Sequence, residues 1–169
     1  MKETNLILEI EGKGTLFAPF SARTCTQSLT PIPQGNLRRT INGKLVWIGS
    51  PTHQKYHSII SCTDHVPPAF DGLWKGSQVK VSCLQTLTHP IPEGRAEIDL
   101  ERDPASLLLI DHHGKPWKVD CQQHITPPQN FPGGFAIYAP RLVMMVENFK
   151  LDLDEWGLKV GWTLELVEV

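Results

Sequence analysis

The triplet Asp111-His112-His113 has the residue types that could carry out metal-dependent chemistry. Carboxylate and imidazole ligands suit manganese, and two such ions about 3.5 to 4 Å apart can clamp the in-line displacement of phosphoester hydrolysis. Such a site also needs further aspartates at the ends of parallel strands, with helices between the strands. The sequence shows no such alternation, and Gly114 places the triplet in a hairpin turn. We interpret residues 111–113 as a solvated turn, with a metal-dependent hydrolase as an alternative.

Two Cys-x-x-His units form a second group of metal-ligand types, Cys62 to His65 and Cys121 to His124. Thiolate and imidazole are the ligands that zinc prefers, and two such units can close a tetrahedral site. The alternative is a small buried thiol, because Cys62 ends an apolar run. The four cysteines of the chain are scattered and include no Cys-x-x-Cys pair, which indicates reduced thiols. Metal binding by these two units stays open at this point.

The sequence lacks the signatures of nucleophilic catalysis and of phosphate binding. It contains no Gly-x-Ser-x-Gly elbow, no glycine-rich phosphate loop that leads into Lys-Ser or Lys-Thr, and no Gly-x-Gly-x-x-Gly motif. We therefore expect a protein that is not an enzyme, with no cofactor, no catalytic residues and no small-molecule substrate.

The overall charge argues against a nucleic-acid partner. Sixteen Lys and Arg residues stand against 18 Asp and Glu residues, so the net charge is −2, whereas nucleic-acid sites usually carry large basic patches. Arg38 and Arg39 form a local basic pair, which we interpret as a salt bridge or a contact between subunits. Near-neutral charge also suits the packing of identical subunits, because strong like charge would oppose it.

The elements that must position these residues are predominantly strands. The 169 residues include 13 Gly and 14 Pro, above the average of about 12 % for the two together, and this suits many short strands joined by turns. The length predicts one domain, residues 1–169, with its own core. We expect an all-β fold, an antiparallel β-sandwich or β-barrel with long proline-rich loops. The charged start of the sequence and the short apolar runs lead us to expect neither an export signal nor a membrane span.

The strongest local signal is a hairpin over residues 37–48. Its two apolar runs flank Asn42-Gly43, a pair that favours tight hairpin turns because both central residues of such a turn need positive φ. A second hairpin is expected over 106–119, with Gly114 in its turn. The longest pairing is expected between residues 135–149 and 158–169, with a turn over 154–157.

Alternating apolar residues predict further strands. These strands are expected over 4–10, 55–63 and 78–87, and the start of the second could instead be one helical turn after Ser50-Pro51. Proline pairs lie between these runs and mark turns, sheet edges or extended arms, because proline fixes φ and cannot donate a ladder hydrogen bond. Segment 90–105 contains the most charged stretch of the chain, and segment 121–134 lacks a periodic pattern. We expect both to be excursion loops from the core that could contact a partner.

Five tryptophans are many for a chain of this length, and tryptophan is enriched in the centres of protein interfaces. Trp162 fits the core face of its strand, whereas Trp74 and Trp156 lie in turn sequences. A turn tryptophan can cap the end of a sheet or anchor a neighbouring protein. Together with Arg38 and Arg39, these two are the candidate interaction residues. A carbohydrate-binding module is an alternative, because exposed tryptophans can stack on sugar rings.

Three stretches together resemble small structural proteins encoded in the late genes of tailed bacteriophages. The first is LRRTINGKLVWIGSPTHQKYHSIISCTDHVPPAFDGLW, the second is FAIYAPRLVMMVENFKLDLDEWGLKVGWTLELVEV, and the third is the opening FAPFSARTCTQSL. In the second, an aromatic-Pro-Arg-Leu strand precedes an acidic turn and a final Trp-x-Leu-x-Leu-x-Glu strand. The resemblance covers roughly residues 10 to 90 and 134 to 169, and residues 93–133 have no counterpart.

The resemblance implies a non-enzymatic component of the virion, made in the host cytoplasm and placed in the tail or its distal baseplate region. It also implies many copies in a ring, with copies of itself and other phage structural proteins as partners and neither nucleic acid nor a membrane. A capsid-decorating or head-to-tail joining protein is the alternative within the same class. No catalytic residues come with the resemblance.

Overall fold

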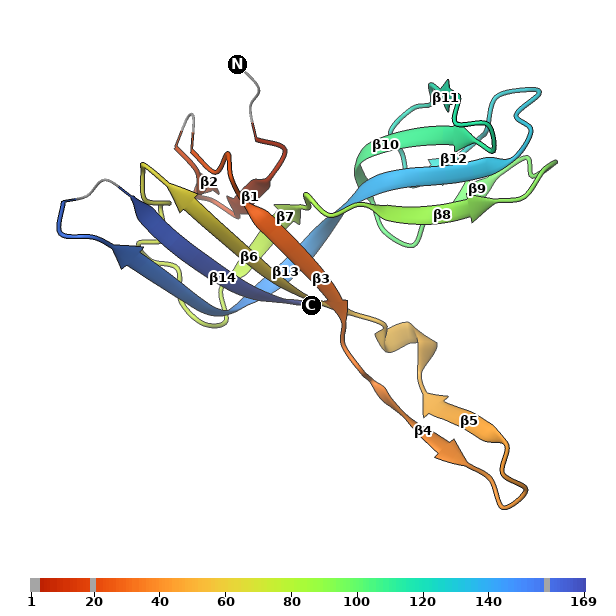
Figure 1. The fold of residues 1–169 in the computed structure, drawn as a ribbon, viewed down its shortest axis with the longest axis horizontal. Coiled ribbons are helices and arrows are strands. Elements are labelled where there is room, and N and C mark those ends of the chain that lie inside the picture. The colour runs from red at the N-terminus through yellow and green to blue at the C-terminus, as the bar shows by residue number, and fades with distance from the viewer. Residues whose placement is uncertain (1–3, 19–20, 157–158) are drawn as a thin grey trace.

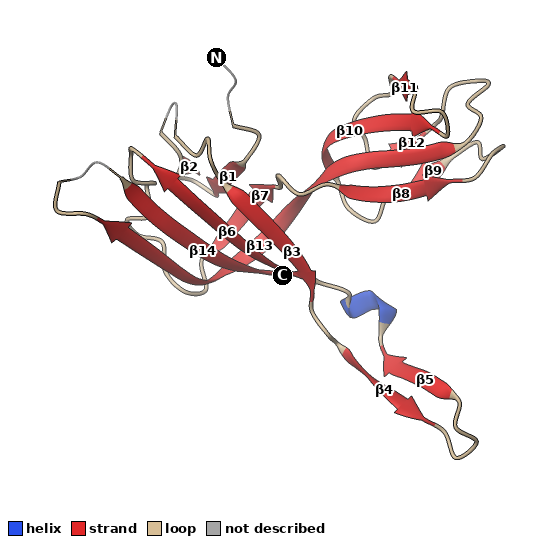
Figure 2. Cartoon of the chain, in the orientation of Figure 1, coloured by secondary structure: helices blue, strands red, loops and turns tan. Residues whose placement is uncertain are grey.

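The computed structural model describes residues 4–18, 21–156 and 159–169 and is built almost entirely of antiparallel strands (Figures 1 and 2). The strands are β1 (Ile7–Ile10), β2 (Gly14–Thr15), β3 (Thr26–Pro31), β4 (Gly35–Arg39), β5 (Leu45–Gly49), β6 (Tyr56–Asp64), β7 (Gln78–Ser82), β8 (Leu87–Ile91), β9 (Ile98–Asp99), β10 (Pro104–Asp111), β11 (Pro116–Trp117), β12 (His124–Ile125), β13 (Gly134–Leu153) and β14 (Val160–Glu168). A single turn of 3₁₀ helix, η1 (Pro51–His53), precedes β6. The prediction of an antiparallel all-β fold is confirmed. No helix in the described part of the chain has the length and apolar composition needed to cross a bilayer.

The main lobe is a curled, sandwich-like sheet with the strand order β2-β1-β7-β13-β14-β6-β3. Among the described residues no pairing joins β3 to β2, so the sheet is not a closed barrel. Alternate residues of β6, β7, β14 and the middle of β13 are buried, and the inner faces of β1 and β7 share one apolar cluster with those of β6 and β14. Trp162 lies in this cluster, in ring contact with Phe17 and Phe70, as its strand pattern predicts.

The second lobe is built on the first half of β13, which pairs with β8 on one side and β10 on the other. Figure 1 shows the 20-residue strand β13 running from this lobe into the main lobe. The second lobe has a separate apolar cluster, which shares no member with the first. Segments 90–105 and 121–134, expected as excursion loops, meet here through the pairing of β9 with β12. They supply Ile91, Ile98 and Ile125 to the cluster, so they build a core of their own.

The β4–β5 hairpin is the third part of the molecule and extends away from both lobes (Figure 1). We call residues 33–49 the arm. The predicted hairpin over 37–48 is present, but its turn differs from the expected tight one. Gly43 N donates to Thr40 O at 2.8 Å, and Gly43 alone takes positive φ, +77°, whereas Asn42 does not. This is a longer turn that closes with a glycine bulge, a common alternative in hairpins.

The strand predicted over 4–10 is present as β1, which starts at Ile7. The strand predicted over 78–87 is present only in its first half, because β7 ends at Ser82 and β8 of the second lobe begins at Leu87. The hairpin over 106–119 corresponds to β10 and β11, and the final pairing corresponds to β13 and β14. The helical turn offered as an alternative after Ser50-Pro51 is η1, and the predicted strand 55–63 follows it as β6. The predicted turn over 154–157 ends at a residue outside the described part of the chain.

Candidate interaction surface

The arm has no core. Every residue from 33 to 49 is exposed, and the exposed apolar side chains on it are Leu37, Ile41, Leu45, Val46, Trp47 and Ile48. Leu37 and Ile48 are 66 % and 61 % exposed. An isolated two-stranded hairpin is marginal in water, and contiguous exposed apolar residues mark interaction sites. The arm therefore has the composition of a segment that is covered by another molecule.

The base of the arm is shaped by a tryptophan that lies across two glycines. Gly35 and Gly49 face each other in the hairpin, and a Cβ added at either would lie about 2.5 Å or less from the ring of Trp47. Glycine is required here because only a bare backbone lets the indole lie flat. A groove of about 480 Å³ lies at this base. Leu37 and Trp47 of the arm line it together with Tyr56 of β6.

The arm carries positive charge and no acidic residue of its own. Residues 12–63 contain no Asp or Glu, and they contain the six cations Lys13, Arg23, Arg38, Arg39, Lys44 and Lys55. All 18 acidic residues lie outside this stretch. The guanidinium of Arg39 donates to Gly43 O at 2.9 Å and so supports the turn of the arm. The uneven distribution of acidic residues can be read from the sequence, but the net charge of −2 does not reveal it.

The two candidate tryptophans are both exposed. Trp74 is 74 % exposed in the loop before β7, where its backbone N–H donates to Ser77 Oγ at 3.1 Å. Trp156 is 83 % exposed after the end of β13. The arm leaves the sheet where Tyr56 pairs with Pro31, whereas Trp156 lies beyond the opposite end of β14, where Val160 pairs with Asp64. The structure thus separates Trp156 from Arg38 and Arg39 on the arm.

The Asp111-His112-His113 triplet forms the β10–β11 turn. The Asp111 carboxylate is buried and accepts hydrogen bonds from the backbone N–H groups of His113 and Lys115, both at 2.9 Å, and from Trp117 Nε1 at 3.2 Å. Its oxygens thus brace the hairpin, and a metal would have to displace these donors. The structure supports the interpretation as a turn, although the aspartate is buried and only the histidines are solvated.

Replacing Asp111 with asparagine is expected to lower the unfolding temperature, whereas His113→Ala leaves it nearly unchanged. The bond from the Lys115 N–H is the largest of several effects that lower the pKa of Asp111. A lowered pKa in the folded state means stability that is present above the unfolded pKa of about 3.9 and lost as pH falls through the folded value. Melting curves between pH 2 and 6 should therefore fall less steeply for Asp111→Asn. If the melting temperatures of the wild type and of Asp111→Asn fell in parallel as the pH was lowered, this role of the Asp111 carboxylate would be contradicted.

The two Cys-x-x-His units are not brought together. Cys62 is buried in the main-lobe cluster, whereas Cys121 is exposed in the second lobe, with its thiol 3.5 Å from Pro104 O. His124 pairs instead with Asp99 at 2.6 Å, and this hydrogen bond, with the charge of Asp99, raises the pKa of the imidazole. The four predicted ligands therefore do not form one zinc site.

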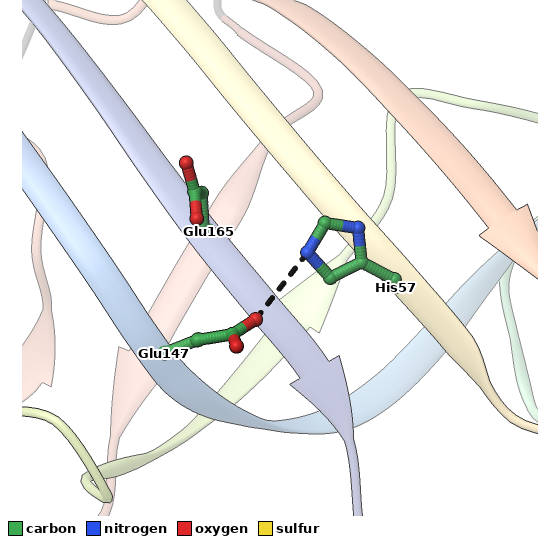
Figure 3. A group of neighbouring side chains, drawn as sticks. All are labelled: His57, Glu147 and Glu165. Atoms are coloured by element: carbon green, nitrogen blue, oxygen red, sulfur yellow. Dashed lines mark ion pairs between the residues drawn. The ribbon is translucent and has the colours of Figure 1, made fainter. Parts of the chain in front are cut away.

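Sequence reasoning missed a group of titratable side chains on the outer face of the main sheet. His57 on β6, Glu165 on β14 and Glu147 on β13 have ligand atoms within 4.8 Å of one another, and His57 Nε2 lies 3.5 Å from a Glu147 oxygen (Figure 3). The β13–β14 register shifts between Val146 and Asn148, so Glu147 is the extra residue of a β-bulge. Bulges re-aim side chains, and no sequence pattern signals this one. Two carboxylates and an imidazole at this spacing suit a cation.

Comparison with protein-family models gave no match, and comparison with curated proteins gave no significant match.

Proposed function

We propose that this chain is a non-enzymatic structural subunit of a tailed bacteriophage that assembles with copies of itself in the tail or distal baseplate region, using the arm as its docking element. The single observation that carries the assembly role is the exposure of the arm's apolar residues. The resemblance in residues 10 to 90 and 134 to 169 supports the phage assignment. The arm lies within the first of these segments.

Thermodynamics favours a covered arm. A hairpin that exposes six apolar side chains pays an ordering cost without gaining a core. Burial of such side chains against a neighbour gains roughly 25 cal/mol for each Å² of apolar surface removed from water. An arm inserted into the next subunit would also place its two strands in a drier environment, where their hydrogen bonds compete less with water.

The assembly role is tested with Leu37→Thr, Ile41→Thr and Ile48→Thr combined in one variant, because threonine keeps the strand preference and removes apolar surface. We expect the wild type to sediment as an oligomer and this variant as a monomer of 19.0 kDa, with an unchanged circular dichroism spectrum. The matched control combines Val66→Thr, Leu108→Thr and Leu153→Thr, at exposed apolar sites outside the arm, and should assemble like the wild type.

Two results of the sedimentation series would reject the assembly role. One is a wild type that stays monomeric at every concentration, and the other is an arm variant that assembles as well as the wild type. The virion location is tested separately by immunogold labelling of phage particles, where label on the tail supports the proposal and label on the head supports the alternative location.

A further inference from the structure

We propose that the arm of one copy binds the outer face of β6, β14 and β13 of a second copy, where Arg38 pairs with Glu147 and Glu165. This inference rests on the proposed function, which makes the arm a docking element, and it adds the surface that receives the arm. We call this surface the outer face and define it by Ile59, Val143, Met145, Glu147 and Glu165.

The outer face exposes apolar side chains, which the alternation along its strands turns away from the core. Leu142, Met144 and Val146 of β13 point into the core, so their neighbours point outward. Val143 and Met145 are 46 % and 38 % exposed, and Ile59 on β6 is 37 % exposed. Such apolar residues on neighbouring strands of one sheet give a partner a surface on which to lie.

The acidic centre of the outer face complements the arm. Glu147 and Glu165 lie beside His57, with their ligand atoms within 4.8 Å of one another. A guanidinium can donate two parallel hydrogen bonds to carboxylates, which adds specificity to the charge attraction. The arm carries Arg38, Arg39 and Lys44 and no carboxylate, so the arm of a second copy can bring positive charge to these two glutamates.

One face of the arm fits this surface better than the other. The register pairs Leu37 with Trp47 and Arg38 with Val46, so alternation puts Arg38, Val46 and Ile48 on one face. The opposite face holds Leu37 and Trp47, which line the groove at the arm's base. The face with Arg38 therefore remains for a neighbour, with Val46 and Ile48 placed to contact Met145 and Ile59.

The geometry permits a heterologous contact. The arm extends away from the main sheet in Figure 1, so a copy can offer its arm to one neighbour while its outer face receives the arm of another. Head-to-tail contacts of this kind close into rings when the rotation between copies permits. The proposal thus gives a structural route to the ring implied by the resemblance.

The test uses charge reversal on each side of the contact. Arg38→Glu is expected to weaken self-association at least about tenfold, as is the double variant Glu147→Lys with Glu165→Lys, because close charge pairs at interfaces couple strongly. A 1:1 mixture of the two should associate again, because the intact arm of one meets the intact outer face of the other. The control Glu11→Lys with Glu93→Lys makes the same charge change at exposed sites elsewhere and should leave association unchanged.

The outcomes separate this inference from the proposed function. If the threonine variant of the arm is monomeric but reversal of Glu147 and Glu165 has no effect, the arm docks elsewhere and the inference is overturned alone. A monomeric wild type overturns both. Association that is lost in EDTA and restored by Zn²⁺ would show that a metal occupies the carboxylates, and would also overturn the pairing with Arg38. If the lysine variant misfolds, Glu147→Gln with Glu165→Gln replaces it, with weaker association expected and full association contradicting the proposal.

Discussion

Replacing Leu109 with alanine is expected to lower the melting temperature of the second lobe and leave that of the main lobe unchanged. Leu109 is fully buried in the second cluster, and the two clusters share no residue. Large-to-small changes at buried leucines cost about 2 to 5 kcal/mol. β13 is the long strand common to both lobes, but its two halves contribute to different clusters.

Calorimetry combined with hydrogen exchange measures the effect. The matched variant is Leu164→Ala, which removes the same side chain from the main cluster, where Leu164 is also fully buried. We expect each variant to increase exchange in its own lobe first. A single transition, lowered equally by both changes, would show that residues 1–169 unfold as the one cooperative domain that the chain length predicts.

The parts of the fold that could be predicted are those governed by local periodicity. Residues 78–81 alternate between exposed and buried positions as the sequence indicates, and β14 pairs along its whole length with the second half of β13. Alternation dictates which side chains share a face, whatever the partner. Glycine at position 43 or 114 likewise marks a turn because each takes positive φ.

The second lobe could be predicted only at its hairpin over 106–119, because several of its other strands are too short to show a period. β9, β11 and β12 have two residues each, and two residues cannot display alternation. Its core instead forms from isolated apolar residues such as Ile98 and Ile125, brought together by pairing between distant segments. Burial of this kind depends on long-range contacts that a single sequence does not reveal.

The candidate site was predicted only in part, for a physical reason. Exposed apolar residues on an arm have the same sequence pattern as buried ones in a sheet. The hairpin could therefore be predicted, but its position away from both lobes could not. Trp74 and Trp156 are exposed as their turn positions indicate. The outer-face carboxylates were missed because they come from two strands, and a bulge places one of them.

Removing Arg102 is expected to have the largest effect of any single change at the surface. The Arg102 guanidinium donates to Glu168 at 3.1 Å and to Gln54 O at 2.6 Å, and lies over the Tyr56 ring at 5.1 Å. The side chains of Arg102 and Glu168 are only 14 % and 9 % exposed. One residue thus joins the second lobe, the last strand of the main lobe and the base of the arm.

Arg102→Ala should lower the free energy of unfolding by about 3 to 5 kcal/mol, because it leaves the Glu168 carboxylate buried without its counter-charge. The double variant Arg102→Met with Glu168→Gln should lower the free energy of unfolding much less, since no uncompensated charge remains.

Arg141→Ala is the matched control. Its ion pair with Asp103 has the same 3.1 Å distance but is about half exposed, and exposed pairs contribute about 0 to 1 kcal/mol. Urea unfolding measures all three. Equal losses for Arg102→Ala and Arg141→Ala would contradict a role for burial, whereas a large loss for Arg102→Ala alone would show that burial gives the Arg102–Glu168 pair its larger contribution to stability.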